Sequence, residues 1–382
     1  MAGFSIRFLG CKVSHTDAQQ VRERLLAEGH VESPSADIAV VNTCCVTHEA
    51  VRKSRHAVSR AARTHARVYV TGCGANLDGD AFAGMPRNVT VVDRPSEETP
   101  GFVAGDVGAI GCVRADARLE RVRAFVKVQD GCSFSCNFCV VPLVRGPSRS
   151  RRAAAVLGEI RRRVDQGHRE VVLTGINLGC YRDREAGYTL ARLRLSSIEV
   201  NHVTDELVTA LRETPTLARH LHVPLQSGDD QVLAAMARRY TSSTYLKRLE
   251  GLADFNLTTD VIVGFPAENE LAFRRTLRLV RAAGITKVHV FPYSPRPGTR
   301  TAAEDPVPAA IKKDRSARLR ALSHEACLGR WRSKLGTDDF VLVDRPGRGY
   351  GDDYSPWLVN APVGELVRVR AAAVAEEGIV AA

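Results

Sequence analysis

The stretch RAFVKVQDGCSFSCNFC, residues 123–139, joins a strand pattern to a loop with three cysteines. Residues 123–131 contain a short apolar run rich in Val and Phe, which predicts a β-strand that leads directly to Cys132, Cys136 and Cys139. Structural zinc sites close with four ligands, and no cysteine or histidine follows Cys139 closely. Three thiolates instead suit an iron–sulfur cube with one iron open to a substrate. The loop therefore predicts a reactive cluster rather than a zinc knuckle.

The chain after this loop repeats an alternation of strands and helices. Strands are expected at 169–175, 192–200, 219–226, 257–266 and 286–294, and helices at 150–166, 203–213 and 268–283. Together with 123–131, this series predicts a parallel sheet curved into a partial barrel, whose chemistry lies at the C-terminal strand ends. The interval 176–191 is polar and has no helical period, so this crossover is expected to be a bare loop or an abbreviated helix.

The first 95 residues also alternate strands with helices, and three of these strands end at a cysteine. The strands at 4–10, 36–44 and 66–73 end at Cys11, Cys44 and Cys73, respectively. Ligands bind at the C-terminal edge of parallel α/β sheets, so these thiols are expected to converge. Cys45 adjoins Cys44, and neighbouring side chains on an extended segment point to opposite faces. Cys45 is therefore expected to pack away from Cys44.

The remaining segments complete the domain organisation. Residues 96–120 are rich in turn formers and are expected to form a linker, and short strands punctuated by Gly and Pro begin near residue 337. The expected fold class is α/β, with an N-terminal parallel α/β domain over 1–95, a central partial (β/α)6 barrel over 121–325 and a small C-terminal β domain over 337–382.

The composition indicates the class of partner and the compartment. Lys and Arg number 54 against 43 Asp and Glu, and a net charge of +11 suits a polyanion such as nucleic acid. No apolar run approaches the ~18 residues that span a bilayer, and the N-terminus lacks the pattern of a secretory signal. We therefore expect a cytoplasmic protein with no membrane partner. In that compartment, ten cysteines favour metal binding over disulfides.

The spacing Cys-x3-Cys-x2-Cys, with Phe138 before the last cysteine, resembles the radical S-adenosylmethionine (SAM) superfamily. Other motifs resemble the methylthiotransferase family in its order and cover residues 4–300 almost continuously. They are FLGCKV (8–13), VVNTCCVT (40–47), TGC (71–73), RGPSRSR (145–151), LTGIN (173–177), PLQSGDD (224–230) and TTDVIVGFP (258–266).

The resemblance implies a radical SAM barrel and two 4Fe–4S clusters. One cluster would be held by Cys132, Cys136 and Cys139 and would bind SAM at its open iron. A second, auxiliary cluster would be held by Cys11, Cys44 and Cys73 and would carry the sulfur to be inserted, the family motif selecting the cysteine directly after Asn-Thr. Two SAM molecules are implied, one to methylate this sulfur and one to generate the 5′-deoxyadenosyl radical. An electron donor such as flavodoxin or ferredoxin is also implied.

Further site residues are expected at strand ends and in basic runs. The SAM pocket is expected to be lined by Gly175, Asn177, Ser196, Glu199, Gln226 and Asp260. The C-terminal β domain stands where the family carries its RNA-binding module of the TRAM type. RNA contacts are expected from Arg145, Arg149, Arg151, Arg368 and Arg370.

The substrate is indicated by the motifs NTCCVT (42–47) and VHVFPYSPRPGTRTA (288–302). They are most similar to the branch that acts on N6-threonylcarbamoyladenosine next to the tRNA anticodon, which implies methylthio insertion at C2 of that base. Three alternatives stay open: isopentenyladenosine in tRNA, an aspartate of a ribosomal protein, and a non-catalytic RNA-binding iron–sulfur protein. The last is kept open by the crossover at 176–191, where family members usually carry a helix.

Overall fold

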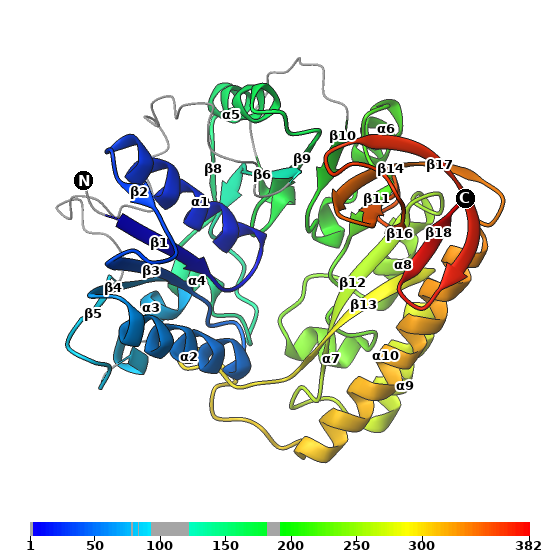
Figure 1. Cartoon of the computed structure of the whole chain (residues 1–382). Coiled ribbons are helices and arrows are strands. Elements are labelled where there is room, and N and C mark those ends of the chain that lie inside the picture. Colours follow the sequence, from blue (N-terminus) through cyan, green and yellow to red (C-terminus); the bar gives the residue numbers. More distant parts are fainter. Residues whose placement is uncertain (1–2, 78, 83, 93–121, 182–191) are drawn as a thin grey trace.

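The structure of the chain is a computed structural model that describes residues 3–77, 79–82, 84–92, 122–181 and 192–382 (Figure 1). The expected linker at 96–120 lies outside these ranges, as does most of the crossover at 176–191. Within the described ranges, no helix combines the length and the apolar character needed to cross a bilayer.

A five-stranded parallel sheet with the strand order β2-β1-β3-β4-β5 forms the N-terminal part. Its strands are β1 (Gly3–Phe8), β2 (Val31–Glu32), β3 (Ile38–Thr43), β4 (Arg67–Gly72) and β5 (Val89–Val91), and its helices are α1 (Lys12–Ala27), α2 (His48–Thr64) and α3 (Cys73–Leu77). The 3₁₀ turn η1 (Gly79–Phe82) follows α3. Buried β-branched residues such as Val41 and Val68 form the sheet core, at 1% and 0% exposure, which suits strands covered on both faces.

Six parallel strands form a partial barrel, as the sequence predicts. The order β10-β9-β6 makes one half and β11-β12-β13 the other, and the isolated bridges Leu193–Leu217 and Ser197–His222 connect them. The strands are β6 (Arg123–Lys127), β9 (Glu170–Thr174), β10 (Arg192–Leu195), β11 (His220–His222), β12 (Asn256–Val263) and β13 (Ile285–Pro292). The parallel sheets confirm the predicted α/β class.

The elements between these strands cover the barrel and carry its loops. The helices are α4 (Val141–Arg145), α5 (Ala153–Asp165), α6 (Asp205–Glu213), α7 (Asp230–Ala235), α8 (Ser242–Glu250) and α9 (Glu270–Ala282). A short antiparallel pair, β7 (Gln129–Asp130) with β8 (Arg149–Ser150), flanks the three-cysteine loop. In the crossover, Leu178–Cys180 form the 3₁₀ turn η2, and Val200–His202 form η3 after β10.

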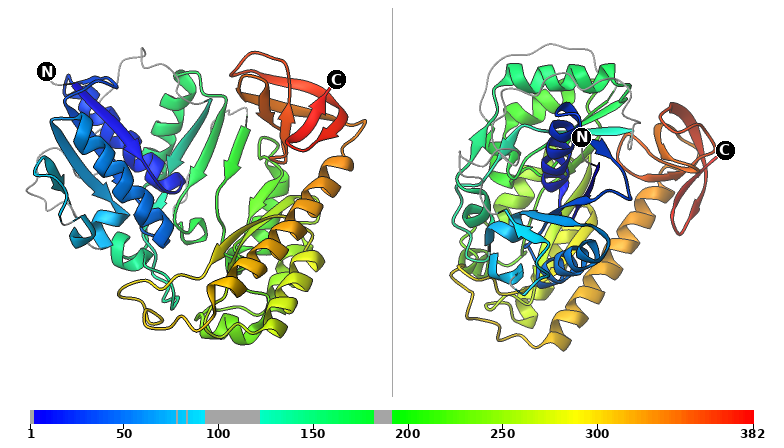
Figure 2. Two further views of the ribbon diagram at one scale, coloured as in Figure 1. Left: turned by 60° about the horizontal axis from the view of Figure 1, so that its bottom comes forward. Right: turned by 60° about the vertical axis from the view of Figure 1, so that its left-hand side comes forward.

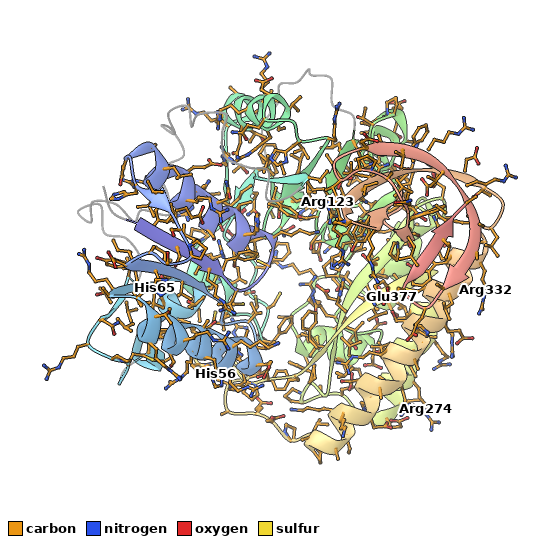
Figure 3. All side chains as sticks on the ribbon, in the orientation of Figure 1. His56, His65, Arg123, Arg274, Arg332 and Glu377 are labelled. Carbon is orange, nitrogen blue, oxygen red and sulfur yellow. The ribbon has the colours of Figure 1, made fainter. Side chains whose placement is uncertain are left out.

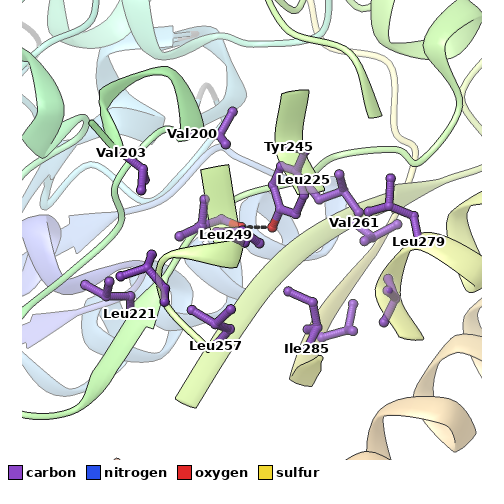
Figure 4. Close-up of a cluster of buried hydrophobic side chains, with 14 of the residues drawn as sticks. Val200, Val203, Leu221, Leu225, Tyr245, Leu249, Leu257, Val261, Leu279 and Ile285 are labelled. Atoms are coloured by element: carbon purple, nitrogen blue, oxygen red, sulfur yellow. Dashed lines mark hydrogen bonds between the residues drawn. The ribbon is translucent and has the colours of Figure 1, made fainter. Parts of the chain in front are cut away.

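The barrel core is aliphatic, in keeping with an aromatic content of only 6%. Figure 4 shows Leu221, Leu225, Val261 and Ile285 in one buried cluster with Tyr245, all of them at most 2% exposed. The Tyr245 hydroxyl donates to the carbonyl of Val223 at 2.7 Å, which satisfies its buried polar group.

The C-terminal part is a closed barrel at the end of the long helix α10 (Ala309–Arg332), as both views of Figure 2 show. Its strands follow the order β14-β15-β16-β18-β17 and are β14 (Asp338–Arg345), β15 (Arg348–Tyr350), β16 (Pro356–Leu358), β17 (Leu366–Ala375) and β18 (Gly378–Ala381). β16 and β18 pair in parallel, whereas the other strand pairs of this barrel are antiparallel. Helix α10 also continues past residue 325, the expected end of the central barrel.

This small barrel covers the N-terminal ends of the central strands. Arg192, which begins β10, donates to the carbonyl of Phe340 at 2.6 Å, and Arg123, which begins β6, pairs with Asp344 at 2.9 Å. Figure 3 shows Arg123 at this junction. Because this end is covered by protein, the open loops of the central barrel are those at its C-terminal strand ends.

Candidate active site

The loop that carries Cys132, Cys136 and Cys139 runs from β7 to α4 and closes on itself tightly. The Cys132 amide donates to the carbonyl of Gly146 at 3.0 Å, and the Cys139 amide donates to the carbonyl of Cys136 at 3.2 Å. Gly131 has a φ of +68°, and a side chain there would collide with the carbonyl of Pro147. The loop therefore holds its three thiols in a fixed arrangement at the C-terminal end of the first barrel strands.

The three thiols of this loop lie close enough to affect one another. Burial, with a smaller effect of the neighbouring Cys136 and Cys132, raises the pKa of Cys139 to about 12. Mutual repulsion of this kind disfavours three thiolates unless a cation lies between them. A cationic metal centre reverses this effect, because a coordinated thiol is deprotonated.

Arg238 connects this loop to the strand ends opposite. Its guanidinium donates to the Cys136 sulfur at 3.3 Å and to Glu199 at 3.1 Å, and its Nε donates to the Tyr240 hydroxyl at 3.2 Å. Arg238 therefore places a positive charge beside one of the three sulfurs. Sequence reasoning did not identify Arg238 as a site residue, although it lies in a short Arg-Arg-Tyr-Thr motif after α7.

The residues expected to line a SAM pocket lie at the C-terminal strand ends. Asn177 and Ser196 are 6% and 4% exposed, and their Oδ1 and Oγ atoms have no hydrogen-bond partner among the described residues. Buried polar atoms are normally paired, so these two fit a ligand that supplies hydrogen bonds. A side chain at Gly175 would lie 3.0 Å from the Gln129 amide oxygen, so this glycine allows close packing.

Glu199, Gln226 and Asp260 lie at the same end but have protein partners. The Glu199 carboxylate accepts from Arg238 and from the Asn201 amide, at 3.1 and 2.9 Å. Gln226 adopts a left-handed φ of +66°, and its amide donates to the Asp260 carbonyl at 2.8 Å.

Two histidines accompany Asp260, and sequence reasoning missed both. The Asp260 carboxylate lies 3.2 Å from Nε2 of His222, and one side-chain atom each of His222, Asp260 and His289 lie within 4.8 Å of one another. His222, Asp260 and His289 come from three neighbouring strands, β11, β12 and β13, and the sequence pattern alone does not show that they meet.

The N-terminal cysteines meet at the C-terminal edge of their sheet. Cys11 caps the start of α1, Cys44 follows β3, and Cys73 begins α3. A side chain at Gly10, whose φ is +123°, would lie 3.3 Å from Cβ of Cys44, so these two loops touch. Burial raises the pKa of Cys73 to about 11, Arg145 lowers it, and Cys11 and Cys44 raise it. The structure therefore brings the three predicted ligands together.

Cys45 is 1% exposed and packs with Val140 and Val144 beside the cluster loop, and burial raises its pKa. Cys73 belongs to the same apolar cluster, and burial raises the pKa of Cys44 too, so burial alone does not distinguish Cys45 from the expected ligands.

A buried ion network joins the two cysteine sets. Arg145, from α4, donates to the Cys73 sulfur at 3.1 Å and pairs with Asp17 of α1 at 2.7 Å and Asp130 at 3.0 Å. Lys127 pairs with the same two carboxylates, at 2.6 and 3.0 Å. These contacts couple the N-terminal sheet directly to the loop that holds the second cysteine set.

This network corrects two of the expected RNA contacts. The side chain of Arg145 is only 8% exposed, and that of Arg151 is 10% exposed and pairs with Glu159 at 2.6 Å. Both side chains form internal ion pairs, so neither is available to bind a phosphate. Arg149 is exposed, and Arg368 and Arg370 are 68% and 64% exposed beside Asp338.

Comparison with known proteins agrees with this architecture. A family model described as the radical SAM superfamily matches residues 126–280, and a model described as uncharacterized protein family UPF0004 matches residues 3–93. The threonylcarbamoyladenosine tRNA methylthiotransferase of Thermotoga maritima is 33% identical over 415 residues, which covers 98% of this chain and 95% of that relative. This chain belongs to the radical SAM methylthiotransferase family. It is therefore a radical SAM enzyme that transfers a methylthio group.

Other relatives carry related names. The protein of the same name from Bacillus subtilis is 34% identical and covers 85% of this chain and 81% of its own length. A tRNA-2-methylthio-N(6)-dimethylallyladenosine synthase from Sorangium cellulosum is also 34% identical, covering 92% and 84%. A solved radical S-adenosylmethionine methyltransferase from Kitasatospora setae shares the fold at 15% identity, with a TM-score of 0.59 over 79% of this chain and 77% of that structure.

Membership of the family implies a 4Fe–4S cluster and SAM, and the residues present fit both. The loop of Cys132, Cys136 and Cys139 supplies three thiols and no fourth ligand of its own. The unpaired oxygens of Asn177 and Ser196 lie on neighbouring strand ends of the same barrel edge. The Asn177 oxygen can accept a hydrogen bond and the Ser196 hydroxyl can donate or accept one, which suits a polar organic ligand placed beside the cluster.

Proposed function

We propose that this enzyme inserts a methylthio group at C2 of N6-threonylcarbamoyladenosine next to the tRNA anticodon, with two SAM molecules and two 4Fe–4S clusters. The observation that carries the proposal is the pair of three-cysteine sets joined by Arg145, which reaches from one set to Cys73 of the other. Two sets that each leave one iron open suit a reaction that needs one cluster for SAM and one for the transferred sulfur.

The choice of base rests on the motifs and on the relatives. Relatives that act on threonylcarbamoyladenosine and on dimethylallyladenosine are 33% and 34% identical to this chain, so identity alone does not distinguish the two bases. The stretch 288–302 and the motif around Cys44 favour threonylcarbamoyladenosine. The second candidate is methylthiolation of dimethylallyladenosine in tRNA, the base called isopentenyladenosine above.

The chain's own residues have distinct parts in the proposed reaction. The cluster, when bound with SAM, supplies the electron that cleaves the sulfonium. Cys132, Cys136 and Cys139 would hold it, and Arg238 would orient Cys136 relative to Glu199. The barrel edge with Asn177 and Ser196 would bind SAM. Arg145 would fix Cys73, and with it the auxiliary cluster, at a constant position relative to the first.

Two partners follow from this reaction. One is the tRNA. Because the substrate is tRNA, we also propose a cytoplasmic location. The other is a small one-electron donor such as flavodoxin or ferredoxin, because each cleavage of SAM to the radical consumes one electron.

Mass spectrometry of tRNA nucleosides from cells with and without the gene tests the proposal. We expect the deletion strain to lose 2-methylthio-N6-threonylcarbamoyladenosine and to accumulate its unmethylthiolated parent, and a plasmid copy to restore the modified base. Loss of the 2-methylthio derivative of isopentenyladenosine instead would favour the second candidate. Unchanged tRNA nucleosides would contradict the proposal and direct the search to ribosomal protein.

Arg368 and Arg370 on β17 test the RNA-binding part of the proposal. We expect R368E/R370E to weaken tRNA binding roughly tenfold at low salt and to lower the slope of log K against log salt by about 2, one for each phosphate contact. Filter binding or fluorescence anisotropy over a salt series measures both. R274E/R278E is the control with the same change of net charge, since Arg274 and Arg278 are exposed on α9, and Arg274 lies away from the small barrel (Figure 3). Equal losses in both variants would mean that only net charge matters.

A further inference from the structure

Helix α2 lies in a stretch of the sequence that is strongly cationic. Residues 50–67, AVRKSRHAVSRAARTHAR, hold six Arg and Lys and no Asp or Glu. This stretch alone therefore has a formal charge of +6, against +11 for all 382 residues. Charges of one sign that lie close together repel one another and oppose compact folding, so such a concentration points to an anionic partner.

The cations of α2 lie on the face that is turned away from the sheet. Val58 is 0% exposed and packs in the sheet core. His56, Arg60 and Arg63 are exposed, and they form one row because residues three or four positions apart share one face of a helix. These three side chains and Thr64 line a surface hollow, and Figure 3 labels His56 on this helix. Packing of the opposite face therefore fixes a cationic row at the surface.

The arginines of this row are not balanced by carboxylates. The first turn of α2 holds the helix's single acid, Glu49, which pairs with Arg52 at 2.7 Å. Within the described part of the chain, Arg60 and Arg63 form no ion pair, although both side chains are exposed. The exposed Arg274 of α9, by contrast, pairs with an acid of its own helix at 3.1 Å. The charge of the row is therefore available to an external anion.

Helix α2 is tied to the cysteine set of the N-terminal sheet. The Ser54 hydroxyl accepts from the Cys44 amide at 3.1 Å and donates to the Cys44 carbonyl at 3.3 Å. Arg60 and Arg63 lie six and nine residues after Ser54, which is about 9 and 14 Å along the helix axis. A partner bound to the row is therefore held at a fixed distance from the set assigned to the transferred sulfur.

We propose that the row of His56, Arg60 and Arg63 on α2 binds the phosphate backbone of the substrate tRNA. Each of the two guanidinium groups can contact one phosphate through charge-assisted hydrogen bonds. Figures 1 and 2 show α2 and the small barrel on opposite sides of the central strands, so the RNA is held from two sides. The inference rests on the proposed function, because it names a surface for the same substrate.

A small acidic electron donor is the other anionic partner that a cationic row could bind. Such a donor must reduce the cluster on Cys132, Cys136 and Cys139, whereas α2 is hydrogen-bonded to Cys44 of the other set. The base must come to the sulfur at that other set, and the phosphates beside the base come with it. This placement favours RNA, and tRNA binding and donor-dependent SAM cleavage distinguish the two partners.

Fluorescence anisotropy with labelled tRNA that carries N6-threonylcarbamoyladenosine, over a salt series, tests the inference in the reconstituted full chain. We expect R60E/R63E to weaken binding about tenfold at low salt and to lower the slope of log K against log salt by about 2. R274E/R278E makes the same change of net charge on α9 and should have a much smaller effect. The iron content of R60E/R63E should equal that of the parent, because both side chains are exposed.

The outcomes separate this inference from the proposed function. Equal losses in R60E/R63E and R274E/R278E would overturn it, because net charge alone would explain them. Unchanged tRNA binding in R60E/R63E would also overturn it, and a loss of SAM cleavage with flavodoxin but not with dithionite would then assign the row to the electron donor. If the parent chain binds no tRNA at all, the proposed function fails first, and the role of this row fails with it.

Discussion

Replacing Cys132, Cys136 and Cys139 by alanine is expected to abolish reductive cleavage of SAM and to remove half of the iron. The reason is that these thiols hold the cluster whose open iron binds SAM, while the N-terminal set remains intact. We expect about eight irons per reconstituted chain to fall to about four. Iron analysis and chromatographic detection of 5′-deoxyadenosine under anaerobic reduction measure the two effects.

Two comparisons make this result specific. C327A is the matched control, because Cys327 lies on α10 and its thiol donates only to the carbonyl of Thr286, at 3.0 Å. C11A/C44A/C73A should also halve the iron but should still cleave SAM, while methylthio transfer is lost. An unchanged iron count in the C132A/C136A/C139A variant would contradict the assignment of this loop.

Arg145→Met is expected to destabilise the apo chain by about 3–5 kcal/mol, the cost of leaving buried charges without their partner. The substitution leaves Asp17 and Asp130 close together with only Lys127 to balance them. Urea unfolding followed by circular dichroism measures the change in the free energy of unfolding.

Arg149→Met is the control for this second prediction. Arg149 belongs to the same basic run, but its side chain is exposed and makes one weak contact, to the Arg145 carbonyl at 3.4 Å. We expect it to change stability by no more than about 0.5 kcal/mol. If both variants lose the same small amount, the network does not hold the N-terminal sheet to the barrel.

The cysteine sites could be predicted because the signal for them is local. Each N-terminal cysteine stands directly after an apolar strand, and the parallel sheet then brings Cys11, Cys44 and Cys73 to one edge. The barrel strands follow from hydrophobic runs in the same way. The choice of Cys44 over Cys45 rests on the motif around them and stays a prediction.

The charged contacts could not be predicted, because they depend on which distant residues meet. The basic run 145–151 suggested an exposed face, but Asp17 lies 128 positions before Arg145 and buries it. Arg238 meets Cys136 across 102 positions. The pattern of charged residues along the sequence does not indicate which distant residues will form such contacts. The crossover at 176–191 lies mainly outside the described residues, apart from the 3₁₀ turn η2 at its start.

The seating of the small barrel on the N-terminal ends of the central strands has a geometric consequence. Chemistry lies at the opposite ends, and strand β12 alone has eight residues, which corresponds to roughly 26 Å at about 3.3 Å per residue. If Arg368 and Arg370 bind the RNA as proposed, the RNA must extend along the barrel wall to bring its base to the reactive end. The enzyme would then discriminate between RNAs by their length. A free nucleoside or a very short hairpin could enter the reactive end of the central barrel, but it could not contact the small barrel at the same time.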